Sequence, residues 1–395
     1  MKIGVDATCW GNKRGYGRFT RELFEELLAL DDQNQYLFFV DQKTARECSF
    51  PAAVETVIVE TNQAPAEAAS ADGSRSMRDI LAMSRGVLRH KLDIFFFPAV
   101  YSYFPIFNRT KVIVTLHDLI ADNHPELIFP NPRARLFWKV KQDLAVRQAS
   151  LIATVSEHSR MEIKRFFGLP DDRLRVIPEA ARPIFHKIEH NDRSDSVSAK
   201  YGVGPSERFL LYVGGISPHK NLSTLIEAFA ILETDQPDMK LVLVGDYKDD
   251  PFLSAYPRLK REVEEYRLGA KVIFTGYVPD EDLVYLYNLA TLLVFPSFDE
   301  GFGLPAIEAM SCGTPVAASD RGSLPELLGD AGTYFDPGDA RDLAAKVCAA
   351  LSDQSKLDTM HHRGLKRSEN FRWHNAARET LAIFDELGHK SPIYG

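Results

Sequence analysis

The sequence predicts an α/β protein with two doubly wound parallel sheets. Short runs rich in Val, Ile and Leu alternate with longer helical patterns along the whole chain, which is the order of parallel α/β units. These runs are continuously apolar, as expected for strands that helices cover on both faces. The length of 395 residues exceeds the size at which one hydrophobic core usually stops growing, so two domains are expected.

The first half of the chain alternates strand candidates with helical patterns. Helices are expected at 19–30 (FTRELFEELLAL) and at 133–149 (RARLFWKVKQDLAVRQA). The stretch NQAPAEAASADGSRSM at 62–77 is expected to form a long loop, and long loops at the edge of α/β domains are often functional. Strands are predicted at 2–7, 36–41, 54–60, 94–99, 111–118, 151–156 and 174–180.

The second half repeats this alternation after a polar, charged connection at 186–207. Helices are expected at 221–232 and 281–290. We therefore expect Rossmann-like domains at 1–190 and 191–371, with a C-terminal helix at about 372–395 that packs back on the first, and a ligand cleft between the domains. Strands are predicted at 209–215, 240–246, 271–277, 291–297 and 314–319.

Composition narrows the class of protein. The net charge of −8 argues against a nucleic-acid partner. Four scattered cysteines without a CxxC pair indicate reduced thiols, and no signal peptide precedes the first strand, so a cytoplasmic protein is expected. No apolar stretch reaches the length of a membrane span. The basic amphipathic stretch at 133–142 fits either an anionic membrane surface or a helix packed on the sheet, and both stay open.

The segment EGFGLPAIE at 300–308 places two carboxylates around a predicted helix start. Pro305 suits the first turn of a helix, so Glu300 is expected in the preceding loop and Glu308 about one turn inside the helix. The glycines would let a ligand approach the backbone closely. The amides that would point outward at the positive helix end are those of Phe302, Gly303 and Leu304.

Amide donors together with carboxylate acceptors in this segment suit a sugar or a ribose better than a metal ion. The pattern leaves one alternative open, which is simple helix capping by the two acids, worth a few tenths to about 1 kcal/mol each. No metal site is predicted here, and the acidic run 280–282, which follows Pro279, is interpreted as a helix cap and not as metal ligands.

Two glycine-containing turns follow predicted strands. In LYVGGISPHKN a strand ends at Gly214 and Gly215, and Lys220 lies in the turn before the next helix. A lysine there is well placed to neutralise a diphosphate, although a solvated loop lysine is the commoner interpretation in isolation. In the N-terminal turn, Gly15 and Gly17 match only the first half of a dinucleotide fingerprint, so a glycine loop near an anionic or polyhydroxyl ligand is the hypothesis that remains.

The segment TLHD places His117 and Asp118 just past the end of a predicted strand. Parallel α/β proteins build their sites at that end of the sheet, so His117 is a candidate site residue. A structural histidine is the alternative that this pattern leaves open.

Taken together, these segments resemble the retaining glycosyltransferases of family 4, which have the GT-B architecture of two facing Rossmann-like domains. The strongest match is PSFDEGFGLPAIEAMSCGTPVAAS at 296–319, which carries the paired-glutamate motif of that family. The resemblance covers nearly the whole chain apart from 45–90 and 186–207. The other motifs that occur in the family's order and spacing are TLHD, TVSEHSR, LYVGGISPHKNLSTLIEAF, FTGYVPDEDL and SLPELLGDAGTYFDP.

The resemblance implies roles for the matching positions in the second domain, which would bind the sugar nucleotide. Glu308 would hold the ribose hydroxyls, and Glu300 would hold the donor sugar with the amides of Phe302, Gly303 and Leu304. Lys220 would stabilise the departing diphosphate. The remaining donor-binding positions implied by the resemblance are Gly214, Gly215, Tyr277 and Val278, the last two through a backbone that reads the base.

The first domain would bind the acceptor. There the resemblance implies that His117 contacts the donor sugar near the reacting carbon and that Gly15 to Gly17 lie beside phosphate and acceptor. Two positions depart from the family. Many members carry an arginine where Gly215 stands; either Arg14, Arg18 or His219 would take over its role, or stabilisation of the leaving group would rest mainly on Lys220. The asparagine–glycine pair common after VIP is Glu179–Ala180 here.

The implied activity is a metal-independent, cofactor-free transfer of a hexose from a UDP-glucose-type or GDP-mannose-type donor. The acceptor would be a glycan or a lipid-linked saccharide in surface polysaccharide biosynthesis, with peripheral contact at the inner face of the membrane left open. Two alternatives remain, namely a GT-B sugar-nucleotide epimerase and a catalytically silent sugar-binding subunit of a polysaccharide assembly complex. The incomplete glycine fingerprint disfavours a nicotinamide dehydrogenase.

Overall fold

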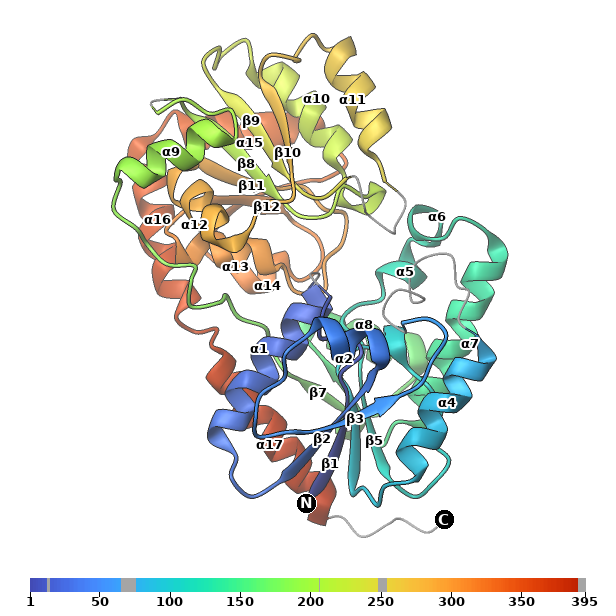
Figure 1. The fold of residues 1–395 in the computed structure, drawn as a ribbon. Helices are drawn as coiled ribbons and strands as arrows, with labels where there is room; N and C mark the ends of the chain where they lie inside the picture. Colours follow the sequence, from blue (N-terminus) through green and yellow to red (C-terminus); the bar gives the residue numbers. More distant parts are fainter. Residues whose placement is uncertain (13–14, 65–75, 206, 248–253, 390–395) are drawn as a thin grey trace. The chain divides into compact units, whose positions relative to one another are not determined.

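The computed structural model describes residues 1–12, 15–64, 76–205, 207–247 and 254–389. Within these residues the chain forms two compact units, each built around one parallel sheet (Figure 1). The first unit comprises Met1–Glu179 and Arg372–Gly395, and the second comprises Ala180–Phe371. The prediction of an α/β protein with two doubly wound sheets is confirmed. Arg14 and most of the loop expected at 62–77 lie outside the described residues.

The first sheet has seven strands in the order β3-β2-β1-β4-β5-β6-β7, and every pair is parallel. Its central strands β1, β4 and β5 are buried apart from the first residue of β1 and of β5, which explains their continuous apolar sequences. The strands are β1 (Lys2–Asp6), β2 (Gln35–Asp41), β3 (Glu55–Val59), β4 (Ile94–Phe97), β5 (Lys111–Thr115), β6 (Leu151–Thr154) and β7 (Leu174–Val176).

Helices cover both faces of this sheet. On one face α1 (Gly15–Leu30) and α17 (Trp373–His389) lie side by side, and Phe24 and Phe384 contact Phe96 of β4. On the other face α4 (Met77–Leu88), α7 (Pro132–Gln148) and α8 (Glu157–Phe167) share one apolar core with the strands. The short helices are α2 (Gln42–Glu47), η1 (Val100–Ser102), α5 (Ile120–Asn123), α6 (Pro125–Ile128) and η2 (Asp171–Arg173).

The second sheet has six parallel strands in the order β10-β9-β8-β11-β12-β13. These are β8 (Phe209–Val213), β9 (Lys240–Val244), β10 (Val272–Gly276), β11 (Leu292–Phe295), β12 (Val316–Ser319) and β13 (Gly332–Phe335). Its helices are α9 (Asp192–Lys200), η3 (Pro218–Lys220), α10 (Leu222–Leu232), α11 (Tyr256–Glu265), α12 (Asp280–Leu289), α13 (Leu304–Ser311), α14 (Leu324–Leu328), α15 (Ala340–Leu351) and α16 (Gln354–Ser368).

The polar connection at 186–207 differs from its expectation as a simple linker. It forms α9, which Asn191 caps, and α9 packs on α12. Two acids of the run 280–282 hold the connecting segment: Asp282 binds Lys200 at 2.6 Å, and Asp280 binds Arg182 at 2.8 Å. The prediction that these acids cap α12 is therefore wrong, because Pro279 is the cap and no cap hydrogen bond is made. The connecting segment thus packs within the second unit, which begins at Ala180.

Among the described helices, none combines the length and the apolar character needed to cross a lipid bilayer.

Candidate active site

Each sheet has one point at which its strand order reverses. In the first sheet this point lies between β1 and β4, and in the second it lies between β8 and β11. In doubly wound proteins the loops after two such strands diverge to opposite sides, and ligands bind at the carboxyl edge of the sheet there. The candidate residues of each unit lie in segments that follow strands, either in a loop or in the first turns of the next helix.

In the second unit, Lys220 and Glu300 form an ion pair at this point. Lys220 follows β8 and Glu300 follows β11, and the Nζ–Oε1 distance is 2.6 Å. The Lys220 and Glu300 side chains are only 17% and 9% exposed, so solvent screens the pair weakly. The interpretation of Lys220 as a solvated loop lysine is wrong, because its ammonium group contacts one of the two predicted glutamates.

Asn221 holds the Lys220 turn against the end of β11. It adopts a left-handed conformation with φ of 58°, and its Nδ2 donates to the carbonyls of Pro296 and Pro337. The amide of Phe298 also donates to the carbonyl of His219. These contacts bring the turn after β8 to the loop after β11. Asn221 was expected only as the start of a helix, and its local sequence gives no sign of these distant partners.

The loop from Glu300 to Gly303 is fixed by the segment that follows β12. The Ser323 hydroxyl lies within hydrogen-bond distance of the carbonyls of Glu300 and Phe302, at 2.9 and 2.8 Å. Gly303 has φ of 105° and immediately precedes α13. A Cβ atom on Gly322 would lie 2.7 Å from the Glu300 amide nitrogen, so only glycine allows this approach. Ser323 and Gly322 are supporting residues that the sequence interpretation missed.

Glu308 lies one turn inside α13, as predicted, and is almost fully buried. Its Oε2 accepts a hydrogen bond of 2.9 Å from the hydroxyl of Tyr287 on α12. Asp299 and Glu300 are also buried, so three carboxylates of this segment are withdrawn from solvent. Helix capping does not explain this arrangement, because Glu300 pairs with Lys220 and Glu308 pairs with Tyr287.

Gly214 and Gly215 continue from β8 at the same edge. The Gly214 amide donates to Val244, and a Cβ on the neighbouring Gly245 would lie 2.1 Å from the Gly214 carbonyl oxygen. The backbone here is therefore closely packed. Tyr277 and Val278 follow β10, where Tyr277 is half exposed and Val278 is buried. Contact of these four residues with a donor remains a prediction.

In the first unit, His117 lies two residues beyond the end of β5, with both ring nitrogens near acceptor oxygens. Nε2 is 3.0 Å from the Pro98 carbonyl, and Nδ1 is 3.4 Å from the Glu179 carboxylate. A carbonyl oxygen can only accept, so Nε2 must carry a proton. A proton on Nδ1 as well gives an imidazolium that Glu179 neutralises.

Glu179 determines the charge state of His117. Burial disfavours the charged ring, but the hydrogen bond and negative charge of Glu179, together with the Pro98 carbonyl and the charge of Asp118, outweigh it, so the pKa of His117 lies above its usual value. Glu179 is 4% exposed and occupies the position where the family often has asparagine. The sequence showed that Glu179 replaces this asparagine, but it did not show that Glu179 contacts His117. The contact of His117 with a donor sugar stays a prediction, since both nitrogens already face protein acceptors.

Gly15 and Gly17 lie in the first turn of α1 and not in a loop before a helix. The helix thus includes residues 15–18, which were expected to precede it, and Asn12 contacts its first turn. The side-chain Nδ2 of Asn12 donates to the Tyr16 hydroxyl at 2.7 Å, and a Cβ on Gly17 would lie 2.2 Å from the backbone carbonyl oxygen of Asn12. Close backbone packing therefore accounts for Gly17, and its predicted contact with phosphate or acceptor is untested.

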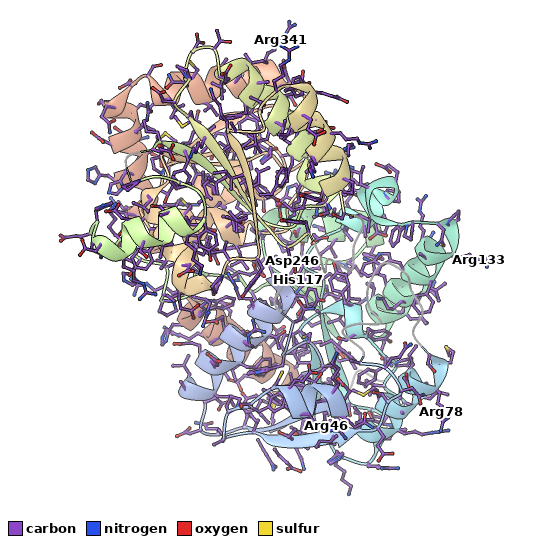
Figure 2. The ribbon with its side chains drawn as sticks, turned by 45° about the horizontal axis from the view of Figure 1, so that its top comes forward. Arg46, Arg78, His117, Arg133, Asp246 and Arg341 are labelled. Carbon is purple, nitrogen blue, oxygen red and sulfur yellow. The ribbon has the colours of Figure 1, made fainter. Side chains whose placement is uncertain are left out.

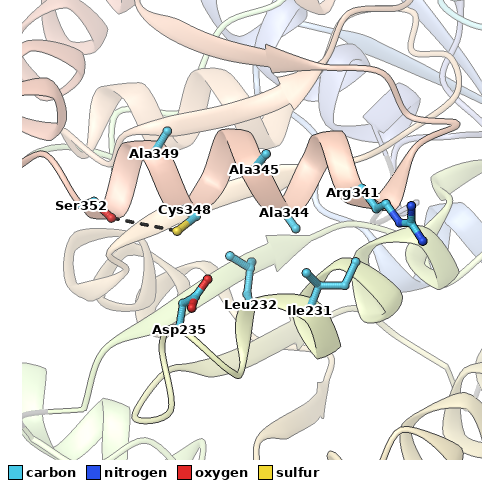
Figure 3. Close-up of a pocket in the computed structure, with 9 residues that line it drawn as sticks. All are labelled: Ile231, Leu232, Asp235, Arg341, Ala344, Ala345, Cys348, Ala349 and Ser352. Atoms are coloured by element: carbon cyan, nitrogen blue, oxygen red, sulfur yellow. Dashed lines mark hydrogen bonds between the residues drawn. The ribbon is translucent and has the colours of Figure 1, made fainter.

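A separate open pocket lies between α10 and α15 (Figure 3). It contains none of the predicted site residues. Its lining residues are Ile231, Leu232, Asp235, Arg341, Ala344, Ala345, Cys348, Ala349 and Ser352.

Two Rossmann-like units, with paired glutamates and a lysine at the reversal point of the second sheet, define a glycosyltransferase of the GT-B class. The comparisons with known proteins agree. Residues 194–367 match the model of the glycosyl transferases group 1, and residues 14–181 match that of glycosyltransferase family 4. The chain belongs to this family, and the predicted resemblance is confirmed.

Named relatives and a solved structure support the same assignment. The O-antigen chain mannosyltransferase B of Escherichia coli is 36% identical over 284 residues, which are 70% of this chain and 71% of that protein. The serotype-specific mannosyltransferase WbdA of Escherichia coli is 34% identical over 279 residues, 70% of this chain but 34% of that longer protein. Anabaena Alr3699/HepE, solved with UDP and glucose, superposes with a TM-score of 0.74 at 20% identity, covering 98% of this chain and 100% of that one. This last likeness shows the fold alone.

Proposed function

We propose that this glycosyltransferase moves a hexose from a nucleotide-diphospho-sugar to a glycan or lipid-linked saccharide, with retention of anomeric configuration, in surface polysaccharide biosynthesis. The observation that supports this most is the largely buried Lys220–Glu300 pair at the reversal point between β8 and β11. Glu308, one turn inside α13, supplies a second buried carboxylate from the same segment.

Lys220 stabilises the leaving group in this proposal. When the bond between the anomeric carbon and the diphosphate breaks, negative charge builds on the phosphate oxygens, and a fixed ammonium group is worth more in a site with little water. Before a donor binds, Glu300 neutralises Lys220. A bound diphosphate would compete with Glu300 for the ammonium, and Glu300 would then be available to the hydroxyls of the sugar.

Glu308 and Glu300 act on different ends of the donor. The Glu308 carboxylate is held by Tyr287, which fixes one oxygen and orients the other for the ribose hydroxyls. Glu300 positions the sugar, and we assign it no covalent role. Retention would follow from attack on the face that the diphosphate leaves, with the departing phosphate taking the proton of the acceptor hydroxyl. No step in this scheme requires a metal ion.

The names of the relatives make a mannosyl donor of the GDP-mannose type our first choice. The structural neighbour that was solved with UDP and glucose makes UDP-glucose the second. The same relatives support an acceptor in O-antigen or a similar polysaccharide. We further propose that the enzyme acts in the cytoplasm at the inner face of a membrane, where lipid-linked acceptors are extended.

The experiment is turnover of GDP-mannose and UDP-glucose by the purified chain with a saccharide acceptor and EDTA present. One donor should release its nucleoside diphosphate, and the anomeric proton of the product should show the configuration of the donor. Lys220→Met should lower kcat by about 10²–10³-fold, whereas Lys271→Met, at an ion pair in the same unit but outside the site, should leave kcat unchanged.

Three results would contradict parts of the proposal. Release of free sugar without any acceptor product would favour the epimerase. Full loss of turnover with EDTA, restored by a divalent ion, would overturn the metal-independent scheme. An inverted anomer would exclude attack on the face that the diphosphate leaves.

A further inference from the structure

Helix α7 carries an apolar stripe that the described part of the fold leaves uncovered. Leu136, Val140 and Leu144 are 63%, 50% and 47% exposed. They are spaced four residues apart, so they lie along one side of the helix. The helix nevertheless packs on the sheet through its opposite side, where Ala145 and Val146 are buried. Packing on the sheet and contact with a membrane surface, the two interpretations of residues 133–142, are therefore compatible, because α7 is apolar on two sides.

Basic residues border the exposed stripe. Arg133, Arg135, Lys139 and Arg147 are all exposed, whereas Asp143 is the one acidic residue of α7. The whole chain, by contrast, has a net charge of −8. This helix is therefore a local positive surface on an acidic protein.

Two neighbouring segments extend the surface. Phe107 is 60% exposed, and the adjacent Ile106 is held by Gln148 at the end of α7 through bonds of 3.0 and 2.7 Å. Helix α4, which covers the same face of the sheet, exposes Met77, Leu81 and Leu88 beside Arg78, Arg85 and Arg89. Figure 2 shows Arg78 and Arg133 projecting from the same side of the first unit.

We propose that this surface, formed by α4, α7 and Phe107 and called the α4–α7 face, docks on an anionic lipid bilayer. Interleaved aliphatic and basic side chains are the composition of helices that lie in a membrane interface, with the aliphatic groups in the acyl boundary and the cations at the lipid phosphates. An anionic surface repels the acidic remainder of the chain and attracts this basic face, so electrostatics would orient the protein with the α4–α7 face toward the bilayer.

A protein partner fits the surface less well. Such a partner would need an acidic rim around an apolar core, whereas here the aliphatic residues form long lines with arginines among them and no aromatic anchor on α7 is exposed. The purpose of docking, access to a lipid-linked acceptor, rests on the proposed function. The docking itself does not depend on the reaction.

The test is flotation of the full chain with vesicles of phosphatidylcholine alone and of phosphatidylcholine mixed with phosphatidylglycerol. The wild type should float with the anionic vesicles at low salt and release at high salt. The triple variant L136S/V140S/L144S should lower the bound fraction about tenfold or more. The matched control is Ile231→Ser, at an exposed aliphatic residue of the second unit, which should bind like the wild type.

Donor turnover and circular dichroism of each variant separate docking from folding and from catalysis. Both should match the wild type, because none of the three residues lies in the candidate site. Absence of flotation with anionic vesicles would overturn the proposal and leave a protein partner as the occupant. Flotation of the triple variant equal to that of the wild type would also overturn it. Loss of turnover with normal flotation would count against the proposed function alone.

Discussion

Removing Lys220 should destabilise the second unit as well as slow the reaction. In Lys220→Met the Glu300 carboxylate stays buried without its cation. At 2.6 Å and an effective dielectric constant of about 20, the lost attraction is about 6 kcal/mol. Hydration that the remaining carboxylate gains offsets part of this loss. Measured losses for buried pairs with one partner removed are about 3–5 kcal/mol, and we expect the lower half of that range.

The double variant Lys220→Met/Glu300→Gln isolates the ion pair. A neutral amide at position 300 needs no cation, so the double variant should recover most of the stability lost in Lys220→Met. Lys271→Met is the control. Lys271 and Glu233 are also 2.6 Å apart, but Lys271 is 26% and Glu233 41% exposed, so its loss should cost less than about 1 kcal/mol.

Urea denaturation followed by far-UV circular dichroism gives the free energy of unfolding, and hydrogen exchange assigns the change to peptides of the second unit. The three tryptophans, Trp10, Trp138 and Trp373, all lie in the first unit, so their fluorescence serves as an internal reference. The reasoning fails if Lys220→Met is within 1 kcal/mol of the wild type, or if the double variant is no more stable than the single one.

Three further predictions concern other described residues. The pKa of His117 in the folded protein lies above its ordinary value of 6.5. The His117–Glu179 pair therefore contributes its full stabilisation below pH 6.5, and this stabilisation is lost as the pH rises through the folded pKa. Glu179→Gln should therefore destabilise the protein more at about pH 5.5 than at about pH 9, and an equal loss in urea denaturation at both would contradict this. Gly303→Ala should lower the free energy of unfolding by about 2 kcal/mol, because Gly303 has φ of 105° and the new Cβ would lie 2.9 Å from the Leu324 side chain. A melting temperature equal to that of the wild type would contradict this prediction. Burial raises the pKa of the Cys9 thiol to about 12, so mass spectrometry should find it unmodified by iodoacetamide in native protein at pH 8, and rapid labelling would refute that burial.

The fold could be predicted because buried strands require a recognisable pattern of apolar residues in the sequence. Strands covered on both faces require continuous apolar residues, and each expected strand is present. The exception is β13, which was not predicted. It pairs only with β12, and Gly332, Thr333 and Tyr334 are only partly buried, so its sequence lacks the apolar run.

The candidate site could be predicted only in part. The position of Glu308 inside a helix followed from Pro305 and was correct. The Lys220–Glu300 pair joins residues 80 positions apart, and only the sheet order brings β8 beside β11. The partner of His117 was hidden for the same reason, since Glu179 follows the edge strand β7.

Local rules also failed where a distant contact competed with them. Acids at the start of a helix usually cap it, but Asp280 and Asp282 bind Arg182 and Lys200 instead. These partners belong to the connection before α9 and to α9 itself, whose position no local pattern indicates. Similarly, Gly15 and Gly17 belong to α1, and the backbone of Gly17 lies close to the Asn12 carbonyl.

The central claim is that the second unit binds a sugar nucleotide through Lys220, Glu300 and Glu308. Calorimetric titration of GDP and UDP into the wild type, Lys220→Met and Glu308→Gln tests it most directly. One nucleoside diphosphate should bind the wild type, and each variant should weaken it at least about tenfold, since a charge-assisted contact is worth about 1.5–3 kcal/mol. Equal affinity in all three proteins, or no binding of either nucleotide to the wild type, would contradict the account.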